Sequence, residues 1–374
     1  MKSNSTKNFS LITIGQIIAT GFHALFYLIF ASLLGPEIFG EISYLIALAG
    51  IFSIISRFGL PYTVTVYGAK NNTILSNQAN VLAIITSAIG AIILLPLNLF
   101  AGILSFGISL FYMNQYNLLG FKKYKKLTVT IIVQSILFVI LPIILYFIIE
   151  IPGIILGLAL ANLICSFNFL SSLNKKIHSF SELRKNFKVL IHNFGVELSV
   201  GLPGIVDKLL IVPLYGFTIV GIYQFNLQIL GAVNIIPALL HGFLLSEESS
   251  GFSNNKIIYL ILTGSVLIAI LTIFLAPLVV EGFFPKFSDG IFSLQVLIFT
   301  VIPLSLSSIF NAKLQAKEST RVGYSSIIRI GSLLILVTIL GELYGLLGLS
   351  FAVFMSTSLY AIFLGFLLSK SMKK

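Results

Sequence analysis

Apolar residues form long, nearly unbroken runs along almost the whole chain, separated by short polar segments or by Gly and Pro. A helix that crosses the hydrocarbon core of a bilayer needs about 20 apolar residues, so the runs predict about twelve transmembrane helices. Continuous apolar runs, without the two-residue alternation of barrel strands, favour helices. The expected ranges are 9–34, 38–60, 79–97, 99–119, 127–149, 152–173, 189–214, 217–245, 256–281, 290–311, 320–341 and 345–369.

The composition supports an all-α integral membrane protein. Hydrophobic residues make up 57% of the 374 residues and charged residues only 9%, whereas soluble proteins carry about 25% charged residues. The net charge is +11, but the basic residues lie between the apolar runs rather than in one patch, so no nucleic-acid partner is expected. A single cysteine, Cys165, excludes a disulfide framework, and the scattered histidines give no metal site; no cofactor is expected.

The positions of Lys and Arg predict the orientation in the cytoplasmic membrane. Outside the spans, every basic residue except Lys286 falls on one side of the predicted topology, which the positive-inside rule assigns to the cytoplasm together with both termini. A basic cytoplasmic loop, 174–188, divides the spans into two sets of six. We therefore expect an N-terminal six-helix lobe at 1–173, a linker at 174–188 and a C-terminal six-helix lobe at 189–374.

The two halves resemble each other when one is shifted along the sequence. A shift of 181 residues superposes Gly35, Gly40 and Gly50 on Gly216, Gly221 and Gly231. The same shift places Gln16, Thr20, His23 and Tyr27 on Glu197, Gly201, Gly204 and Lys208, and the spacing puts each quartet on one face of its helix. Repeats of six spans have the same orientation and are related by a pseudo-twofold axis along the membrane normal; secondary transporters are commonly built in this way.

Charged residues inside apolar spans are candidates for function, because a charge at the bilayer centre costs about 2.5–3.5 kcal/mol. They are Arg57, Glu197, Asp207, Lys208 and Arg329. The eighth span adds a polar stripe of Tyr223, Asn226, Asn234 and His241. Other interpretations stay open: Asp207 or Lys208 could pair with Arg57 or Glu197 as a structural lock, Arg57 and Arg329 could reach the interface, and His23 and His241 could be packing residues. Gly201, Pro203 and Gly204 predict a bend in the seventh span.

Several motifs resemble the polysaccharide-biosynthesis flippases, which belong to the superfamily of multidrug and oligosaccharidyl-lipid exporters. The N-terminal part carries Ile14-Gly15-Gln16, then Leu-Leu-Gly-Pro-Glu-Ile-Phe-Gly from Leu33 to Gly40, then Phe58-Gly59-Leu60. Asp207-Lys208 followed by Gly221-Ile222-Tyr223 is similar to the opening of that family's second lobe.

The resemblance implies a V-shaped pair of six-helix lobes that exports a polyprenyl-diphosphate-linked oligosaccharide by alternating access. It also implies a cationic cavity for the head group, with Arg57, Lys208 and Arg329 as candidates and His23, Tyr27, Tyr223, Asn226, Asn234 and His241 as further lining residues. Glu197 and Asp207 are the candidates for ion coupling. Because the chain has no tryptophan, Tyr27, Tyr44 and Tyr223 are the expected sugar contacts. Expected partners are the lipid-linked glycan, membrane lipids and glycan-assembly proteins.

A multidrug antiporter and a membrane enzyme are the alternatives to the flippase hypothesis. A cation-coupled multidrug antiporter of the same superfamily would need an acidic cavity, but the spans hold three cations and two acids. A membrane enzyme would need a large loop or clustered acid–base residues at one membrane face, and the sequence has neither. The external group Glu281, Lys286 and Asp289 is interpreted as a solvated loop. A transporter is therefore the expected class.

Overall fold

The computed structural model describes residues 2–174, 179–234, 255–316 and 322–372, and the described residues form helices joined by short turns. Among them, eight helices are long and apolar enough to cross a membrane. This confirms an all-helical, multi-pass membrane architecture. The prediction of about twelve spans stays a prediction, as does the symmetry of the lobes.

Three of the eight helices contain a break where the sequence predicted a short external connection. Helix α6 (Tyr124–Leu170) is interrupted at Glu150, α9 (Val206–Val233) at Gly216 and α14 (Val322–Met372) at Gly345, and each of these residues has a positive φ. A positive φ is outside the helical region, so the chain turns there although the helix resumes at once. The predicted junction near Asn98 separates two helices, because one helix ends at Leu94 and the next begins at Leu99. The Asn98 side chain caps the start of the second helix by accepting a hydrogen bond from the Ala101 amide at 2.9 Å.

The chain divides into two compact units. Unit 1 comprises Met1–Ile29 and Tyr44–Ile205, and unit 2 comprises Phe30–Ser43 and Val206–Lys374. The contact units thus separate at about residue 205, whereas the sequence placed the linker at 174–188. The difference arises because the helix after that linker packs on unit 1, as described below. The division into functional lobes at 1–173 and 189–374 stays a prediction.

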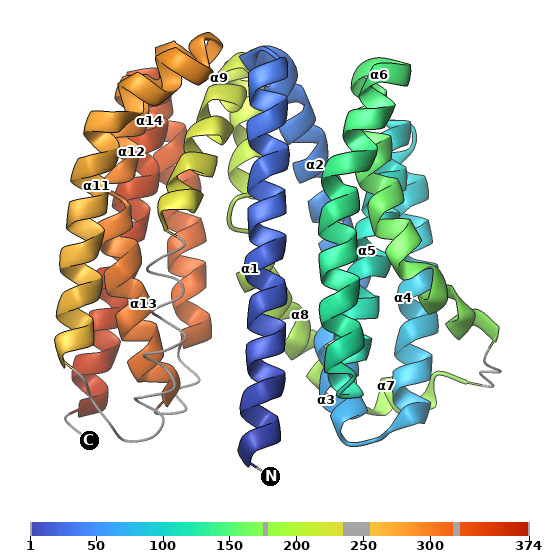
Figure 1. The fold of residues 1–374 in the computed structure, drawn as a ribbon. Helices are drawn as coiled ribbons and strands as arrows, with labels where there is room; N and C mark the ends of the chain where they lie inside the picture. The colour runs from blue at the N-terminus through green and yellow to red at the C-terminus, as the bar shows by residue number, and fades with distance from the viewer. Residues whose placement is uncertain (1, 175–178, 235–254, 317–321, 373–374) are drawn as a thin grey trace. The chain divides into compact units, whose positions relative to one another are not determined.

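Unit 1 is a helical bundle in which α4, α5 and α6 run side by side (Figure 1). Its core contains Leu60, Leu75, Ala83, Leu110 and Met113, all nearly inaccessible to solvent. Many other large apolar side chains of the unit are exposed, as expected for surfaces that face lipid. Its helices are the first part of α1 (Lys2–Leu33), the second part of α2 (Pro36–Arg57), α3 (Leu60–Ala69), α4 (Thr73–Leu94), α5 (Leu99–Gly120), α6, the 3₁₀ turn η1 (Ser171–Asn174), α7 (Ser181–Lys185) and α8 (Phe187–Gly201).

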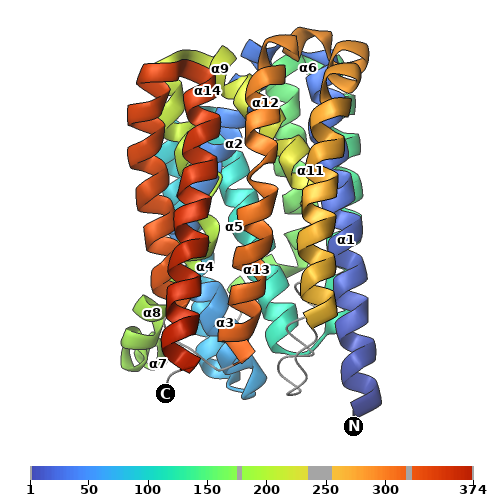
Figure 2. The same ribbon diagram turned by 90° about the vertical axis from the view of Figure 1, so that its left-hand side faces the viewer.

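Unit 2 is a second bundle, in which α13 lies against α14 and α12 against α9 (Figure 2). The turn between α1 and α2 also belongs to this unit: the Lys286 ammonium donates to the Leu33 carbonyl at 3.3 Å, and the rings of Phe39 and Phe287 meet edge to face. Its other elements are α9, α11 (Asn255–Phe283), the 3₁₀ turn η2 (Pro285–Gly290), α12 (Ile291–Ile298), α13 (Val301–Ala316) and α14.

Two glycines of the sequence repeat contact each other in unit 2. A Cβ atom added to Gly40 would meet the Phe217 carbonyl, and one added to Gly221 would meet the Pro36 carbonyl. Pro36 and Phe217 are themselves related by the same shift of 181 residues that relates Gly40 to Gly221. The two contacts are therefore reciprocal between segments that the sequence repeat relates. The close backbone approach also explains why both helices have Gly at this position.

Candidate functional site

The first candidate site begins at the turn between α2 and α3 in unit 1. Phe58 and Gly59 both have a positive φ there, of 45° and 73°, and a non-glycine residue in this region is strained. Any Cβ at Gly59 would collide with the backbone of α8 at Phe194 and Leu190. The Phe58 ring packs on that of Phe194, with centroids 4.4 Å apart. The turn therefore lets α8 approach the end of α2 closely.

This close approach places a carboxylate against two donors from the turn. Glu197 Oε1 accepts from Arg57 Nε at 2.8 Å, and Glu197 Oε2 accepts from the Gly59 amide at 2.9 Å. The side chains of Arg57 and Glu197 are only 3% and 7% exposed. A buried pair that also satisfies its remaining hydrogen bonds can offset its desolvation. The two charges cancel, so this part of unit 1 holds no net charge.

Arg57 has further partners that fix its orientation. Its Nη1 donates to Ser53 Oγ, and Ser53 Oγ in turn accepts from Ser109 Oγ at 3.1 Å. The guanidinium lies over the Tyr112 ring, 4.5 Å from the centroid. These contacts come from one turn earlier on α2 and from α5. Within unit 1, Arg57 and Glu197 thus pair with each other, and the suggestion that Asp207 or Lys208 also pairs with one of them stays a prediction.

A cleft of about 260 Å³ lies beside the ion pair, entirely within unit 1. Three tyrosines surround it: the Tyr62 and Tyr116 ring centroids are 5.1 Å apart, and those of Tyr112 and Tyr116 are 6.4 Å apart in a stacked arrangement. The cleft is lined by Gly50, Ile54, Arg57, Tyr62, Ile108, Tyr112, Tyr116, Glu197, Val200, Gly201, Pro203 and Ile205.

One wall of the cleft is the break between α8 and α9. Helix α8 ends at Gly201, Gly204 has a φ of 78°, and α9 begins at Val206. The bend predicted from Gly201, Pro203 and Gly204 is therefore confirmed as an interruption of the helix. In transporters, discontinuous helices commonly border the substrate site, because the unwound segment exposes backbone polar groups.

A second group of buried polar residues lies in unit 2. Asp207 Oδ2 accepts from the Tyr223 hydroxyl at 2.8 Å, and Oδ1 accepts from the Lys208 amide at 2.9 Å. Lys208 is only 8% exposed. Among the described residues, no carboxylate lies within salt-bridge distance of its ammonium. A buried cation without such a partner is costly in an apolar environment, which marks it as a candidate ligand group.

Arg329 of α14 belongs to the same group. Its guanidinium lies 5.6 Å from the centre of the Tyr360 ring, and the Tyr360 hydroxyl accepts from Asn311 Nδ2 at 2.9 Å. Arg329 also interacts electrostatically with Asp207 and Tyr223. The residues Asp207, Lys208 and Arg329 carry two positive charges and one negative charge. This group thus has a net positive charge, whereas the Arg57–Glu197 pair of unit 1 has none.

The remaining sequence candidates have different surroundings. Asn226 donates to the Gly290 carbonyl at 3.1 Å and to Ser293 Oγ at 2.7 Å, which holds α9 to η2 and α12. The His23 ring packs against that of Phe138 at a tilt of 48° with centroids 4.4 Å apart, and Tyr27 packs edge to face on Phe26. The prediction that these three residues line a substrate cavity stays a prediction. Asn234 lies half-buried just after the end of α9, and His241 lies outside the described residues.

The cleft tyrosines were not predicted from the sequence. Tyr112 and Tyr116 are four residues apart on α5, so they lie on one face of that helix, and Ile108 continues the same face. This spacing is visible in the sequence, but tyrosines in an aromatic-rich span do not by themselves indicate a binding site. Of the tyrosines predicted as sugar contacts, Tyr223 is instead buried with Asp207.

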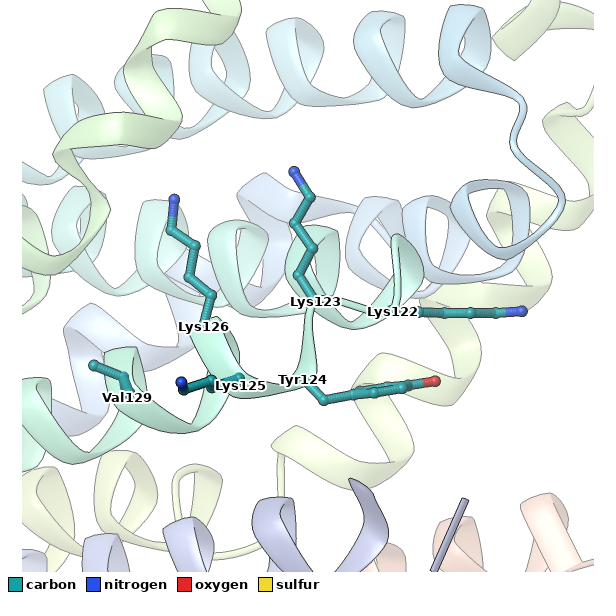
Figure 3. Close-up of a pocket in the computed structure, with 6 residues that line it drawn as sticks. All are labelled: Lys122, Lys123, Tyr124, Lys125, Lys126 and Val129. Carbon is teal, nitrogen blue, oxygen red and sulfur yellow. The ribbon is translucent and has the colours of Figure 1, made fainter. Parts of the chain in front are cut away.

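A separate open cleft of about 610 Å³ lies at the turn between α5 and α6 in unit 1. Lys122, Lys123, Lys125 and Lys126 line it together with Tyr124 and Val129. Figure 3 shows Lys123 and Lys126 extending in one direction and Lys122 and Tyr124 in another. In the predicted topology this turn is cytoplasmic, where a cluster of lysines is the expected orientation signal.

Comparisons with known proteins agree with this architecture. Residues 5–242 match the family model described as "Polysaccharide biosynthesis protein". The lipid II flippase MurJ in an inward closed conformation is similar in structure, with a TM-score of 0.75 at 14% identity over 97% of this chain and 87% of that chain. An inward-facing multidrug-resistance MATE transporter gives 0.70 at 15% identity over 97% and 99% of the two chains.

A third similar structure is a MATE transporter from Vibrio cholerae, with a TM-score of 0.60 at 14% identity over 100% of this chain and 98% of that one. No curated protein matches the chain significantly. At these identities the structural likeness establishes the fold alone.

Proposed function

Because the chain belongs to the polysaccharide biosynthesis protein family, we propose that it is a flippase for a polyprenyl-diphosphate-linked oligosaccharide. It would move the head group across the cytoplasmic membrane by alternating access while the lipid tail stays in the bilayer. The proposal also includes cytoplasmic termini and a supply of substrate by glycan-assembly proteins. The family match supports this substrate class over others of the same fold.

The observation that carries the proposal is the buried ammonium of Lys208, which has no salt-bridge partner among the described residues, together with Arg329, which interacts with the same neighbouring carboxylate, that of Asp207. In a medium of low dielectric constant, a diphosphate and a cation attract each other much more strongly than in water. Asp207 is held by Tyr223, which keeps the single acid of the group occupied. Lys208 and Arg329 are therefore the proposed diphosphate ligands, and Asp207 is the candidate for ion coupling in this unit.

The test replaces each proposed ligand by a neutral residue of similar length. Lys208→Gln and Arg329→Gln are expected to stop export of the lipid-linked glycan while membrane abundance stays normal. Lys188→Gln is the matched control, because Lys188 is exposed near the start of α8. Normal glycan export by both variants, at equal abundance, would refute the head-group role of the two cations.

A second function is favoured by one feature of unit 1. Glu197 lies in a cleft with three tyrosines, and aromatic rings can also bind an organic cation. A multidrug antiporter would give cells resistance to cationic dyes, and that resistance would depend on Glu197. Dye resistance without any effect on surface glycan would replace the flippase proposal by this one.

A further inference from the structure

We propose that the cleft of unit 1 is a subsite for one neutral sugar ring of the transported glycan, with Tyr112 as its stacking platform. The inference rests on the proposed function and refines it: Arg57 and Glu197 contact sugar hydroxyl groups, and the diphosphate is bound elsewhere. Arg57 was expected from the sequence to hold the diphosphate, so the structure assigns it a different part of the same substrate.

The charges that line the cleft cancel each other. Arg57 and Glu197 form a buried ion pair with no net charge, and Glu197 also accepts from the Gly59 amide. A diphosphate could bind Arg57 only by displacing Glu197, which would leave a buried carboxylate without its counter-ion. A neutral ligand requires no such displacement. The intact pair therefore selects against an anionic group and for an uncharged polar one.

Arg57 and Glu197 both have hydrogen-bonding groups that the ion pair does not use. A guanidinium has five N–H donors, and the structure uses one for Glu197 and one for Ser53. An ionised carboxylate has about four acceptor positions, of which Arg57 and Gly59 use two. Arg57 and Glu197 thus keep unused donors and acceptors, and both residues line the cleft. A hydroxyl group both donates and accepts, so the vicinal hydroxyls of a sugar fit this arrangement.

The tyrosines of the cleft provide an aromatic surface. Tyr112 remains 43% exposed although it carries the Arg57 guanidinium on its ring, so it offers open surface to a ligand. Tyr116 is stacked beside it and Tyr62 packs on Tyr116, which makes the platform rigid. Tyrosine gives a large amphipathic contact area with little loss of conformational entropy. The C–H face of a pyranose ring would rest on this surface with its hydroxyls toward the ion pair.

The volume of the cleft limits the size of its ligand. Pockets for drug-sized ligands measure about 300–1,000 Å³, whereas this cleft measures about 260 Å³. It has space for a small ring but not for an oligosaccharide or a lipid tail. Its other walls are apolar side chains and the helix break at Gly201 to Ile205. A single sugar residue of the head group is the matching ligand.

The experiment measures binding of simple glycosides to the purified full-length chain by saturation-transfer NMR. The probes are methyl glucoside, methyl galactoside, methyl rhamnoside and N-acetylglucosamine, and the protein is kept in a detergent without a sugar head group. Tyr112→Leu removes the platform, Tyr112→Phe keeps it, and Tyr259→Leu is the control, because Tyr259 is 69% exposed on α11. Inorganic pyrophosphate and tetraphenylphosphonium serve as competitors.

We expect at least one glycoside to bind and its dissociation constant to rise roughly tenfold in Tyr112→Leu, the size of effect for loss of one aromatic contact. Tyr112→Phe and Tyr259→Leu should bind as the unmodified chain does, and pyrophosphate should not compete. The inference is overturned if no glycoside binds, if Tyr112→Leu binds equally well, or if tetraphenylphosphonium displaces the sugar. Glycan export that depends on Lys208 but not on Tyr112 would overturn this inference alone and leave the proposed function standing.

Discussion

The Nε atom of Arg57 lies 2.8 Å from Oε1 of Glu197 and joins the end of α2 to α8 inside unit 1. The same carboxylate binds the Gly59 amide, so one side chain holds both the last turn of α2 and the strained turn after it. The arrangement has a measurable consequence, because breaking a buried pair leaves the surviving charge without compensation.

Arg57→Ala and Glu197→Ala are each expected to destabilise the protein by about 3–5 kcal/mol. The double variant should lose less than the sum, since no unpaired charge remains. Thermal unfolding of the purified variants in detergent gives the coupling, with Lys185→Ala as the control, because Lys185 forms an exposed pair with Glu182 on α7. Additive losses at Arg57 and Glu197 would show that the two charges act independently.

The contact between Gly40 and Gly221 predicts a contrast between two substitutions on α9. Gly221→Ala should destabilise the protein, because its Cβ would meet the Pro36 carbonyl, which is backbone and cannot turn aside. Gly231→Ala should be neutral or stabilising by up to about 1 kcal/mol, since alanine is the better helix former and nothing lies near its Cβ. The measurement is the apparent unfolding temperature of each variant at equal expression.

The hydrogen bond between Tyr223 and Asp207 predicts the effect of removing one hydroxyl. In Tyr223→Phe, the Asp207 Oδ2 atom loses its partner while staying 98% inaccessible, as Asp207 is only 2% exposed. Leaving a buried acceptor unsatisfied costs about 1–3 kcal/mol. Tyr215→Phe is the control, because Tyr215 is a tyrosine of the same helix whose hydroxyl makes longer contacts with carbonyls of α14. Equal stability of the two variants would argue against a structural role for the Asp207–Tyr223 bond.

Much of the architecture could be predicted from the sequence because lipid imposes a simple rule. A backbone inside the hydrocarbon must satisfy its own hydrogen bonds, so long apolar runs become helices, and the breaks fall where Glu150, Gly216 and Gly345 leave the helical region. The grouping of helices was harder. Helix α8 looks like the start of a second half, but Glu197 and the close approach at Gly59 attach it to unit 1. Such a contact depends on two segments whose proximity the sequence pattern does not reveal.

The site shows the same division between what could and could not be predicted. The cost of burying charge was sufficient to select Arg57, Glu197, Asp207, Lys208 and Arg329, and the structure gathers these residues in two polar groups, one in each unit. Their partners could not be predicted, since Arg57 and Glu197 are 140 residues apart in sequence. The cleft tyrosines were missed because an aromatic residue in an apolar span is equally compatible with lipid, core or ligand.

The orientation of the chain in the membrane can be tested by cysteine labelling, because the chain has a single cysteine, Cys165. Cys165→Ser gives a background without thiols, and the Asn114 hydrogen bond survives this change, because it is made to the Cys165 backbone carbonyl. Ser288→Cys in η2 and Ser371→Cys near the end of α14 then place one thiol at each predicted face. In the predicted topology, the lysine turn from Lys122 to Lys126 and the end of the chain, with Lys370, Lys373 and Lys374, are both cytoplasmic. A membrane-impermeant maleimide added to intact cells should therefore label the thiol at 288 and leave the one at 371 unmodified until the membrane is opened. Labelling of the thiol at 371 in intact cells would place the lysine turn on the outer surface, and the positive-inside argument for this chain would then be wrong.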